Sequence, residues 1–260
     1  MAKYSAVNGV YRKVAKKYDP VDGVYRNVAK AFEPVDGVYR EYFSSGTPVG
    51  SLAVGDSVWL NVNGSLKEFL VVHQGNPDSA MYDASCDGTW LLMKYIYEKR
   101  EWDSDTNNYA SSDIHSYLNG TFLKLFDTDV QPIIKQVKIP YKKNTGSIVS
   151  GSSGKSARIF LLSCPEVGSN IGGSGACLDY FSGISAQNDA KRIGYYNGTA
   201  TDWFLRTPNK SSENYLVYIV TSSGGASSYT GCMASKGIRP AFILDRNTPI
   251  DNSTGINIIA

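Results

Sequence analysis

The sequence predicts an α+β protein dominated by short strands and loops, preceded by a row of small β-hairpins. Its 260 residues include 18 tyrosines and 25 glycines, with many serines and asparagines, which is typical of strand-and-loop proteins. Asn-Gly and Asp-Gly pairs recur between β-forming residues near the N-terminus. Short stretches further on carry the cap and apolar spacing of a helix. Hydrophobic residues make up 42%, enough to build a core.

The first part of the chain is an internal repeat with a period of 14 residues. Val7–Pro20 (VNGVYRKVAKKYDP) is followed by Val21–Pro34 (VDGVYRNVAKAFEP) and by the shorter Val35–Phe43 (VDGVYREYF). A tight primed turn needs positive φ at both central residues, which Asn-Gly and Asp-Gly tolerate well. Each repeat is therefore predicted to form a hairpin, with turns at Asn8-Gly9, Asp22-Gly23 and Asp36-Gly37.

These hairpins are too short to bury a face alone, so they must pair with one another, with a second copy of the chain or with another protein. This favours an attachment region, although the repeats can also be read as the first strands of the main domain. The polar stretch Ser44–Pro48 (SSGTP) marks a change of composition. We therefore expect an attachment region over residues 1–45 and a larger domain over residues 46–260.

The larger domain opens with a predicted hairpin, Val54–Val62 and Leu66–His73, around Asn63-Gly64-Ser65. A buried strand is predicted over Trp90–Tyr97. Further short strands are predicted over Arg158–Ser163 and Leu216–Val220.

Three short helices are expected in the middle of the chain. Ser111 and Ser112 can cap a helix over Asp113–Leu118 that ends at Asn119-Gly120. The second covers Phe122–Phe126, and the third lies near Val130–Gln136. The Gly/Ser-rich stretches Gly146–Lys155 and Gly168–Ala176 are read as surface loops, because they lack the spacing of a phosphate-binding loop and no βαβ unit surrounds them.

Charge and cysteine usage exclude several functions. Lys and Arg number 26 against 24 Asp and Glu, so no general affinity for nucleic acid is expected. The basic excess lies in residues 1–43. No apolar stretch has the length of a signal-peptide core or a membrane span, which predicts synthesis in the cytoplasm without membrane insertion. Because Cys86, Cys164, Cys177 and Cys232 are well separated, we read them as buried free thiols rather than a zinc site.

The usual parts of a catalytic centre are missing from the sequence. Its two histidines are His73, read as a structural residue at the end of an apolar strand, and His115, read as a surface residue. The carboxylates of Glu98, Glu101, Asp103 and Asp105 lie in a polar segment that suits a loop. We therefore predict no enzyme activity, no cofactor and no metal ion.

Several spaced motifs in the larger domain occur together. They are Ser112–Gly120 (SDIHSYLNG), Phe160–Ser163 (FLLS), Asp202–Pro208 (DWFLRTP) and Gly237–Leu244 (GIRPAFIL). Over roughly residues 50–244 the chain resembles a bacterial and prophage domain family of unknown function, whose C-terminal core resembles the fold of C-type lectins and formylglycine-generating enzymes. The segment Gly9–Tyr18 (GVYRKVAKKY) resembles short repeats found ahead of phage tail proteins.

The resemblance implies a C-type-lectin-like mixed domain with long loops, displayed on a virion as part of a phage tail. Some proteins of this fold are variable products of diversity-generating retroelements, which rewrite codons near the C-terminus. A purely structural or decoration protein of the virion is the alternative. An oxidase of the formylglycine-generating type is a third, but it needs paired cysteines, and Cys232 has no evident partner nearby. The sequence also lacks the loop motifs of calcium-dependent sugar binding.

Two groups of residues are expected in the C-terminal third. Trp203, Arg206, Arg239 and Pro240 are read as scaffold, because Arg206 and Arg239 can tie loops to the sheet with buried forked hydrogen bonds. The polar stretch between them is read as a ligand-binding surface or as an ordinary loop, because Tyr, Ser and Asn suit recognition. Its candidate ligand-binding residues are Asn209, Ser211, Ser212, Asn214, Tyr215, Tyr218, Ser222, Ser223, Ser227, Ser228 and Tyr229.

The partners expected from this interpretation are a bacterial surface protein or glycan at the C-terminal surface and other phage tail proteins at residues 1–43. A homo-oligomer formed through the repeats is a further expectation. Nucleic acid is not expected as a partner.

Overall fold

The structure of the protein is a computed structural model. It describes residues 4–7, 10–13, 18–21, 24–27, 30–35, 38–44, 46–184, 187–210 and 214–259. The strands within these ranges are β1 Tyr4–Val7, β2 Val10–Lys13, β3 Tyr18–Val21, β4 Val24–Asn27, β5 Lys30–Val35, β6 Val38–Ser44, β7 Thr47–Pro48, β8 Ser57–Val62, β9 Ser65–Gln74, β10 Thr89–Met93, β11 Glu98–Arg100, β12 Val137–Ile139, β13 Tyr141–Lys142, β14 Ile148–Val149, β15 Lys155–Ala157, β16 Ile159–Phe160, β17 Gly194–Tyr196, β18 Thr199–Thr201, β19 Trp203–Pro208, β20 Leu216–Val220, β21 Ser228–Gly231, β22 Lys236–Ile238, β23 Ala241–Leu244, β24 Pro249–Ile250 and β25 Ile258–Ile259.

Helical structure is limited to short segments. The α-helix among the described residues is α1 Asp113–Tyr117, and the π-helix η4 Leu118–Phe122 follows it directly. The 3-10 helices are η1 Val49–Ser51, η2 Ala84–Cys86, η3 Tyr109–Ser111, η5 Leu123–Leu125, η6 Gln131–Ile133, η7 Pro165–Val167, η8 Asp179–Phe181 and η9 Ala190–Arg192. The fold is therefore mixed and rich in sheet, as predicted. No helix within the described ranges is long and apolar enough to cross a membrane.

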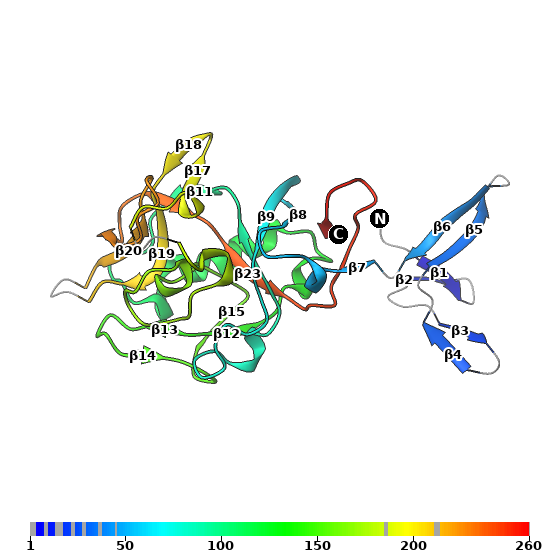
Figure 1. Ribbon diagram of the computed structural model, residues 1–260, viewed down its shortest axis with the longest axis horizontal. Coiled ribbons are helices and arrows are strands. Elements are labelled where there is room, and N and C mark those ends of the chain that lie inside the picture. The colour runs from blue at the N-terminus through cyan, green and yellow to red at the C-terminus, as the bar shows by residue number, and fades with distance from the viewer. Residues whose placement is uncertain are drawn as a thin grey trace.

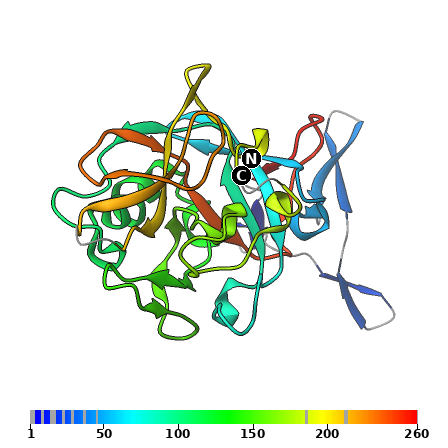
Figure 2. The same ribbon diagram turned by 60° about the vertical axis from the view of Figure 1, so that its left-hand side comes forward.

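The N-terminal repeats form three separate two-stranded antiparallel sheets, drawn in blue in Figure 1 and Figure 2. The pairs are β1–β2, β3–β4 and β5–β6, and the innermost partners are two valines in each pair. This confirms the predicted strand pairing. The predicted turns Asn8-Gly9, Asp22-Gly23 and Asp36-Gly37 lie outside the described residues. None of these six strands belongs to a sheet formed by the described part of residues 46–259.

A six-stranded sheet in the order β16-β23-β10-β9-β8-β25 forms the first half of the larger domain. The predicted hairpin is present as β8–β9 and closes at the pair Val62 and Ser65. Asn63 (φ 53°) and Gly64 (φ 72°) make the turn, so it has two residues and Ser65 belongs to the strand. β10 is buried at every position but ends at Met93, four residues earlier than predicted.

A second sheet contains the motif residues Trp203 and Arg206 and positions the candidate site. Its order is β11-β22-β19-β20-β21, so the fully buried strand β19 is central and β21 is an edge. The predicted strand Leu216–Val220 matches β20. Arg239 and Pro240 lie between β22 of this sheet and β23 of the first sheet, where the chain passes from one sheet to the other.

The beginning and the end of the described part of the larger domain lie together. β7 pairs with β24 in antiparallel fashion, and β25 adds to β8 in parallel fashion. In Figure 1 the red C-terminal segment accordingly runs beside β7. Strand pairing therefore holds the first and the last described segments of the larger domain to each other and to the first sheet.

The helical segment begins as predicted but ends later. The side chain of Ser112 caps α1 by accepting a hydrogen bond from the His115 backbone N–H at 3.2 Å. The predicted end at Asn119-Gly120 is wrong, because η4 runs through these two residues. The second predicted helix, Phe122–Phe126, is present as the 3-10 helix η5 Leu123–Leu125. The Asn119 side chain donates to the backbone oxygens of His115 and Ile159, both at 2.9 Å. It therefore fastens this segment to β16 rather than ending the helix.

Two further expectations are corrected. The third helix is limited to η6, because Ile134 already bridges to Leu244, the last residue of β23. Cys86, Cys164 and Cys232 are buried free thiols as predicted, whereas Cys177 is a free thiol that is exposed. Cys177 follows the glycine-rich segment 168–176, which consists of turns, bends and loop.

His115 is buried, not exposed as predicted, and this gives a pH prediction. It packs against the ring of Tyr109 at 5.4 Å between centroids, and burial lowers its pKa from 6.5 to about 4. As the pH falls through this interval the unfolded chain takes up the proton first, so stability is lost. We expect His115 to account for a loss of at most about 3 kcal/mol between pH 6.5 and 4.

The measurement is urea unfolding of the wild type and of His115→Gln across this pH interval. The difference in unfolding free energy between the two proteins should change with pH, because glutamine does not titrate. Parallel curves for the two proteins would contradict this account of His115.

Candidate functional site

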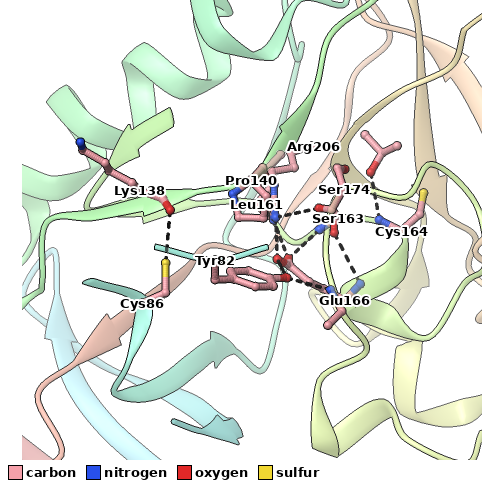
Figure 3. Close-up of polar contacts among 12 residues, drawn as sticks. Tyr82, Cys86, Lys138, Pro140, Leu161, Ser163, Cys164, Glu166, Ser174 and Arg206 are labelled. Atoms are coloured by element: carbon pink, nitrogen blue, oxygen red, sulfur yellow. Dashed lines mark hydrogen bonds and ion pairs between the residues drawn. The ribbon is translucent and has the colours of Figure 1, made fainter. Parts of the chain in front are cut away.

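A buried ion pair lies at the centre of the larger domain. Arg206 in β19 and Glu166 in η7 both have fully buried side chains. The guanidinium donates from Nη1 to Glu166 Oε2 and from Nη2 to Oε1, both at 2.5 Å, a two-pronged pairing. Tyr82 Oη also donates to Oε1 at 2.7 Å, and the Ser163 backbone N–H donates to Oε2 at 2.9 Å (Figure 3). The carboxylate is therefore satisfied on both oxygens.

The same arginine joins distant segments of the chain. Its Nε donates to the Pro140 backbone oxygen at 3.1 Å, and Nη1 donates to that of Leu161 at 2.8 Å (Figure 3). Burial lowers the pKa of Arg206, but the charge and hydrogen bonds of Glu166, together with the nearby Tyr82 and Tyr109, outweigh burial and raise this pKa. Burial and the same carboxylate raise the pKa of Tyr82. Arg206 is thus held as a cation by the fold.

The glycine-rich segment after η7 lies directly on this network. The Ala176 backbone N–H donates to Tyr82 Oη at 3.0 Å. A Cβ at Gly175 would lie 2.7 Å from Tyr82 Oη and 2.8 Å from Ser163 Oγ, and the residue has φ 157°. No side chain fits there, so glycine lets the backbone close over the buried polar groups.

The second arginine of the motif is also buried and ties the two sheets together. Arg239 Nε donates to the Met93 backbone oxygen at 3.1 Å, and its guanidinium carbon lies 4.8 Å from the ring centre of Trp203. Trp203 Nε1 donates to the Arg192 backbone oxygen at 2.9 Å. Pro240 accepts from the Met93 N–H at 2.9 Å. Burial lowers the pKa of Arg239 to about 10. All these contacts are internal, as a scaffold role requires.

Five of the candidate ligand-binding residues gather around the paired strands β20 and β21. Tyr218 and Tyr229 are direct cross-strand partners, with ring centroids 6.0 Å apart and an interplanar angle of 84°. Tyr218 Oη donates to Asn209 Oδ1 at 3.5 Å, and Tyr229 is 53% exposed. Exposed Asn214 and Tyr215 lead into β20. We call Asn209, Asn214, Tyr215, Tyr218 and Tyr229 the tyrosine surface.

The tyrosine surface stands on a well-packed backing. Val217 and Ile219 alternate with Tyr218 along β20 and are buried on the opposite side. The Asn214 backbone oxygen accepts from the Asn107 N–H at 2.8 Å, and Asn107 is itself buried. The Tyr215 backbone oxygen accepts from the Cys232 N–H at 2.7 Å. The backbone that carries the tyrosines is therefore fixed before any ligand arrives.

The candidate serines are placed differently. Ser222, Ser223 and Ser227 lie in the connection between β20 and β21, and exposed Ser228 begins β21. They are at the opposite end of β20 from Asn209 and Tyr215, a separation of roughly 15 Å for a strand of this length. The Ser222 N–H donates to Asp202 Oδ1 at 2.9 Å. Ser211 and Ser212 lie outside the described residues.

The thiol, histidine and carboxylate groups considered in the sequence can also be placed in the structure. Cys232 is fully buried and burial raises the pKa of its thiol, whereas a reactive thiol needs a lowered pKa. His73 Nδ1 lies 2.8 Å from Asp179 Oδ2. No group of three His, Cys, Asp or Glu side chains in the described part of the chain could hold a metal ion.

The sequence indicates the buried role of Arg206, but it does not indicate its partners Glu166 and Tyr82. Glu166 follows the FLLS motif in the stretch Cys164-Pro165-Glu166, and Tyr82 lies in a loop ahead of β10. Neither has a local pattern that indicates burial. The available signal was the arginine itself, since a buried arginine needs polar partners from elsewhere in the chain, either a carboxylate or backbone oxygens.

The fold and the tyrosine surface define a mixed, sheet-rich domain that presents exposed aromatic side chains on a rigid backing. Residues 87–246 match the family described as Domain of unknown function (DUF6273). Because this match spans more than half of the 260 residues, the chain belongs to that family. A comparison with curated proteins gave no match, and neither did a comparison with solved structures.

The buried ion pair should dominate the stability of the domain. Arg206→Met leaves the Glu166 carboxylate buried without its counter-charge, so we expect the free energy of unfolding to fall by about 3–5 kcal/mol. Glu166→Leu should have a similar cost. The double variant should lose clearly less than the sum of the two, because it leaves no unpaired charge behind.

Urea unfolding checks this, and Lys236→Gln is the control. Lys236 pairs with Asp202 at 2.7 Å, but both side chains are more than a quarter exposed, so its loss should cost less than about 1 kcal/mol. Equal effects of Arg206→Met and Lys236→Gln would refute the central role of the buried pair.

Proposed function

We propose that this protein is a phage or prophage tail display protein that binds a bacterial surface protein or glycan. In this proposal residues 1–45 attach it to other tail proteins, and residues 46–260 form a C-type-lectin-like domain that presents the ligand-binding surface. The observation that carries the proposal is the tyrosine surface. Tyr218 of β20 and Tyr229 of the edge strand β21 are cross-strand partners, Tyr215 directly precedes β20, and none of the three is buried.

Binding by such a surface has a clear physical basis. A tyrosine ring offers a large contact area and a hydroxyl, and it loses little side-chain entropy because it has two rotatable bonds. The cross-strand contact between Tyr218 and Tyr229 restricts both rings further. The rings are therefore ordered before a ligand binds, so binding loses little further side-chain entropy.

The serines at the other end of the hairpin extend this proposal. Ser222, Ser223, Ser227 and Ser228 are exposed and carry small hydroxyl groups on a connection between strands. Variation at these positions leaves the buried residues of β20 untouched. A diversified display protein needs its variable residues to be exposed and separate from its core. The placement of these serines supports the proposal that retroelement diversification acts on this region.

The repeats support the attachment part of the proposal. Three hairpins of similar sequence follow one another, and each forms a two-stranded sheet of its own. A two-stranded hairpin is marginally stable alone, so further pairing with a partner would stabilise it. We propose tail proteins, or the hairpins of a second copy, as those partners.

Tyr229→Ala tests the binding surface. We expect at least a tenfold loss of affinity for bacterial cells or their isolated surface glycans and proteins, because the variant removes the most exposed ring of the tyrosine surface. Stability should change by less than about 1 kcal/mol, because the side chain is half exposed. Ile256→Ala is the control, since Ile256 is a large apolar side chain that is 38% exposed and lies between β24 and β25, outside the tyrosine surface.

Binding is measured by adsorption of labelled protein to host cells and to arrays of surface glycans. If Tyr229→Ala adsorbs as well as wild type, the tyrosine surface is not the ligand site. If the wild type adsorbs to no cell or array component, a decoration role replaces the binding role.

Deletion of residues 1–43 tests attachment separately. We expect the truncated protein to bind ligand as the full chain does but to be absent from purified particles, because the proposed contacts with the tail lie in the hairpins. Western blotting of particles from a complemented deletion strain measures incorporation. Normal incorporation of the truncated protein would rule out attachment through the repeats.

A further inference from the structure

A groove of about 390 Å³ lies away from the tyrosine surface, between two hairpins. One wall is the β8–β9 hairpin and the other is the β17–β18 hairpin, which projects from the domain in yellow in Figure 1 and Figure 2. The floor is the segment Met93–Tyr97, which leaves β10 and runs between them. The lining residues are Trp59, Leu66, Lys67, Glu68, Met93, Tyr95, Ile96, Tyr97, Tyr195, Asn197 and Gly198.

Both walls are built to be rigid. Asn63 and Gly64 have positive φ at the tip of β8–β9, and Asn197 (φ 49°) and Gly198 (φ 79°) have positive φ at the tip of β17–β18. These are the tight two-residue turns that hold paired strands in register. Hydrogen bonds join the floor to both walls. The Lys94 backbone N–H donates to the Glu68 backbone oxygen, and the Ile96 backbone N–H donates to the Tyr195 backbone oxygen, both at 2.9 Å. The groove is therefore preformed.

The lining combines exposed rings with an oriented carboxylate. Tyr95 is 50% and Tyr195 41% exposed, although both line the groove. The Glu68 side chain is 10% exposed. Its Oε1 accepts from Ser57 Oγ at 2.5 Å and from Lys94 Nζ at 2.9 Å, which fixes the carboxylate and leaves Oε2 as an acceptor. Trp59 lies directly across the strand pair from Glu68.

We propose that this groove binds a saccharide. One face of a sugar ring consists of C–H bonds that pack on aromatic rings, and its rim consists of hydroxyls that donate to a carboxylate or pair with an amide. Trp59, Tyr95 and Tyr195 supply the rings, and Glu68 with Asn197 supplies the polar partners. This follows the usual design of small-molecule sites, in which apolar walls give contact area and a few polar groups give orientation.

Two observations select a saccharide over other occupants of an aromatic groove. An extended peptide would need free backbone donors, but the N–H groups of Lys94, Ile96 and Tyr97 are bonded within the protein. A quaternary ammonium would meet Lys67 in the lining and Lys94 beside Glu68, so the local charge opposes a cation. A ligand rich in hydroxyls conflicts with neither.

Tryptophan fluorescence gives a site-specific test. Trp90, Trp102 and Trp203 are fully buried, whereas Trp59 is half-buried in the groove. The full chain is titrated with methyl glycosides of glucose, galactose, mannose and N-acetylglucosamine, with their short oligomers, and with choline. We expect a saturable change with at least one saccharide and none with choline. The change should disappear in Trp59→Phe.

Variants then locate the site. Tyr95→Ala should weaken saccharide binding at least tenfold, as read from the fluorescence midpoint, because it removes an exposed stacking ring. Glu68→Gln should weaken it as well. Tyr229→Ala should leave the midpoint unchanged, because it changes the tyrosine surface alone, and circular dichroism verifies that each variant is folded.

The inference is overturned if no saccharide gives a saturable change, if choline gives one instead, or if Tyr95→Ala binds with the wild-type midpoint. It stands independently of the proposed display function. Loss of host adsorption in Tyr229→Ala with unchanged saccharide binding supports both, whereas normal adsorption in Tyr229→Ala with saccharide binding lost in Tyr95→Ala supports the groove alone.

Discussion

A fully buried charge must be satisfied by a counter-charge or by hydrogen bonds, and in this domain that requirement brings together segments far apart in sequence. Arg206 in the central strand β19 meets Glu166 in η7, and Tyr82 completes the carboxylate from a third segment. Removing any partner leaves a polar group in a region of low dielectric, where it cannot reach water. The loop from η7 to Cys177, the approach to β13 and the end of β16 are therefore fixed by a single guanidinium.

The second buried arginine extends this framework from one sheet to the other. Arg239 lies between β22 and β23 and bonds to the backbone beside β10, while its cationic plane rests near Trp203. It has no carboxylate partner among the contacts described, which is consistent with the lowering of its pKa by burial. Backbone oxygens and an aromatic ring satisfy the guanidinium instead. These contacts fix the position of β10 in the first sheet relative to β19 in the second.

This framework explains how the domain can present two surfaces that differ in character. The tyrosine surface lies on a strand pair at a sheet edge and is suited in our proposal to a large partner. The groove is enclosed by two tight hairpins and suited in our proposal to a small ring. Both are rigid for the same reason, since their backbone groups are bonded within the protein and exposed side chains remain for recognition.

The sequence by itself determined the features that depend on neighbouring residues. Asn63-Gly64 specified a hairpin, Ser112 specified a helix start, and the apolar run Leu216–Val220 specified a strand. Tertiary structure decided what depends on residues far away. The Asn-Gly pair at 119–120 predicted a helix end, but the Asn119 side chain bonds to Ile159 and the helical segment continues. Glu166 is the partner of Arg206, although no local pattern indicates this. The groove likewise required two hairpins more than a hundred residues apart to stand on one floor. Turn and cap preferences are local energies, whereas the pairing of buried charges is set by which segments the packed core brings into contact.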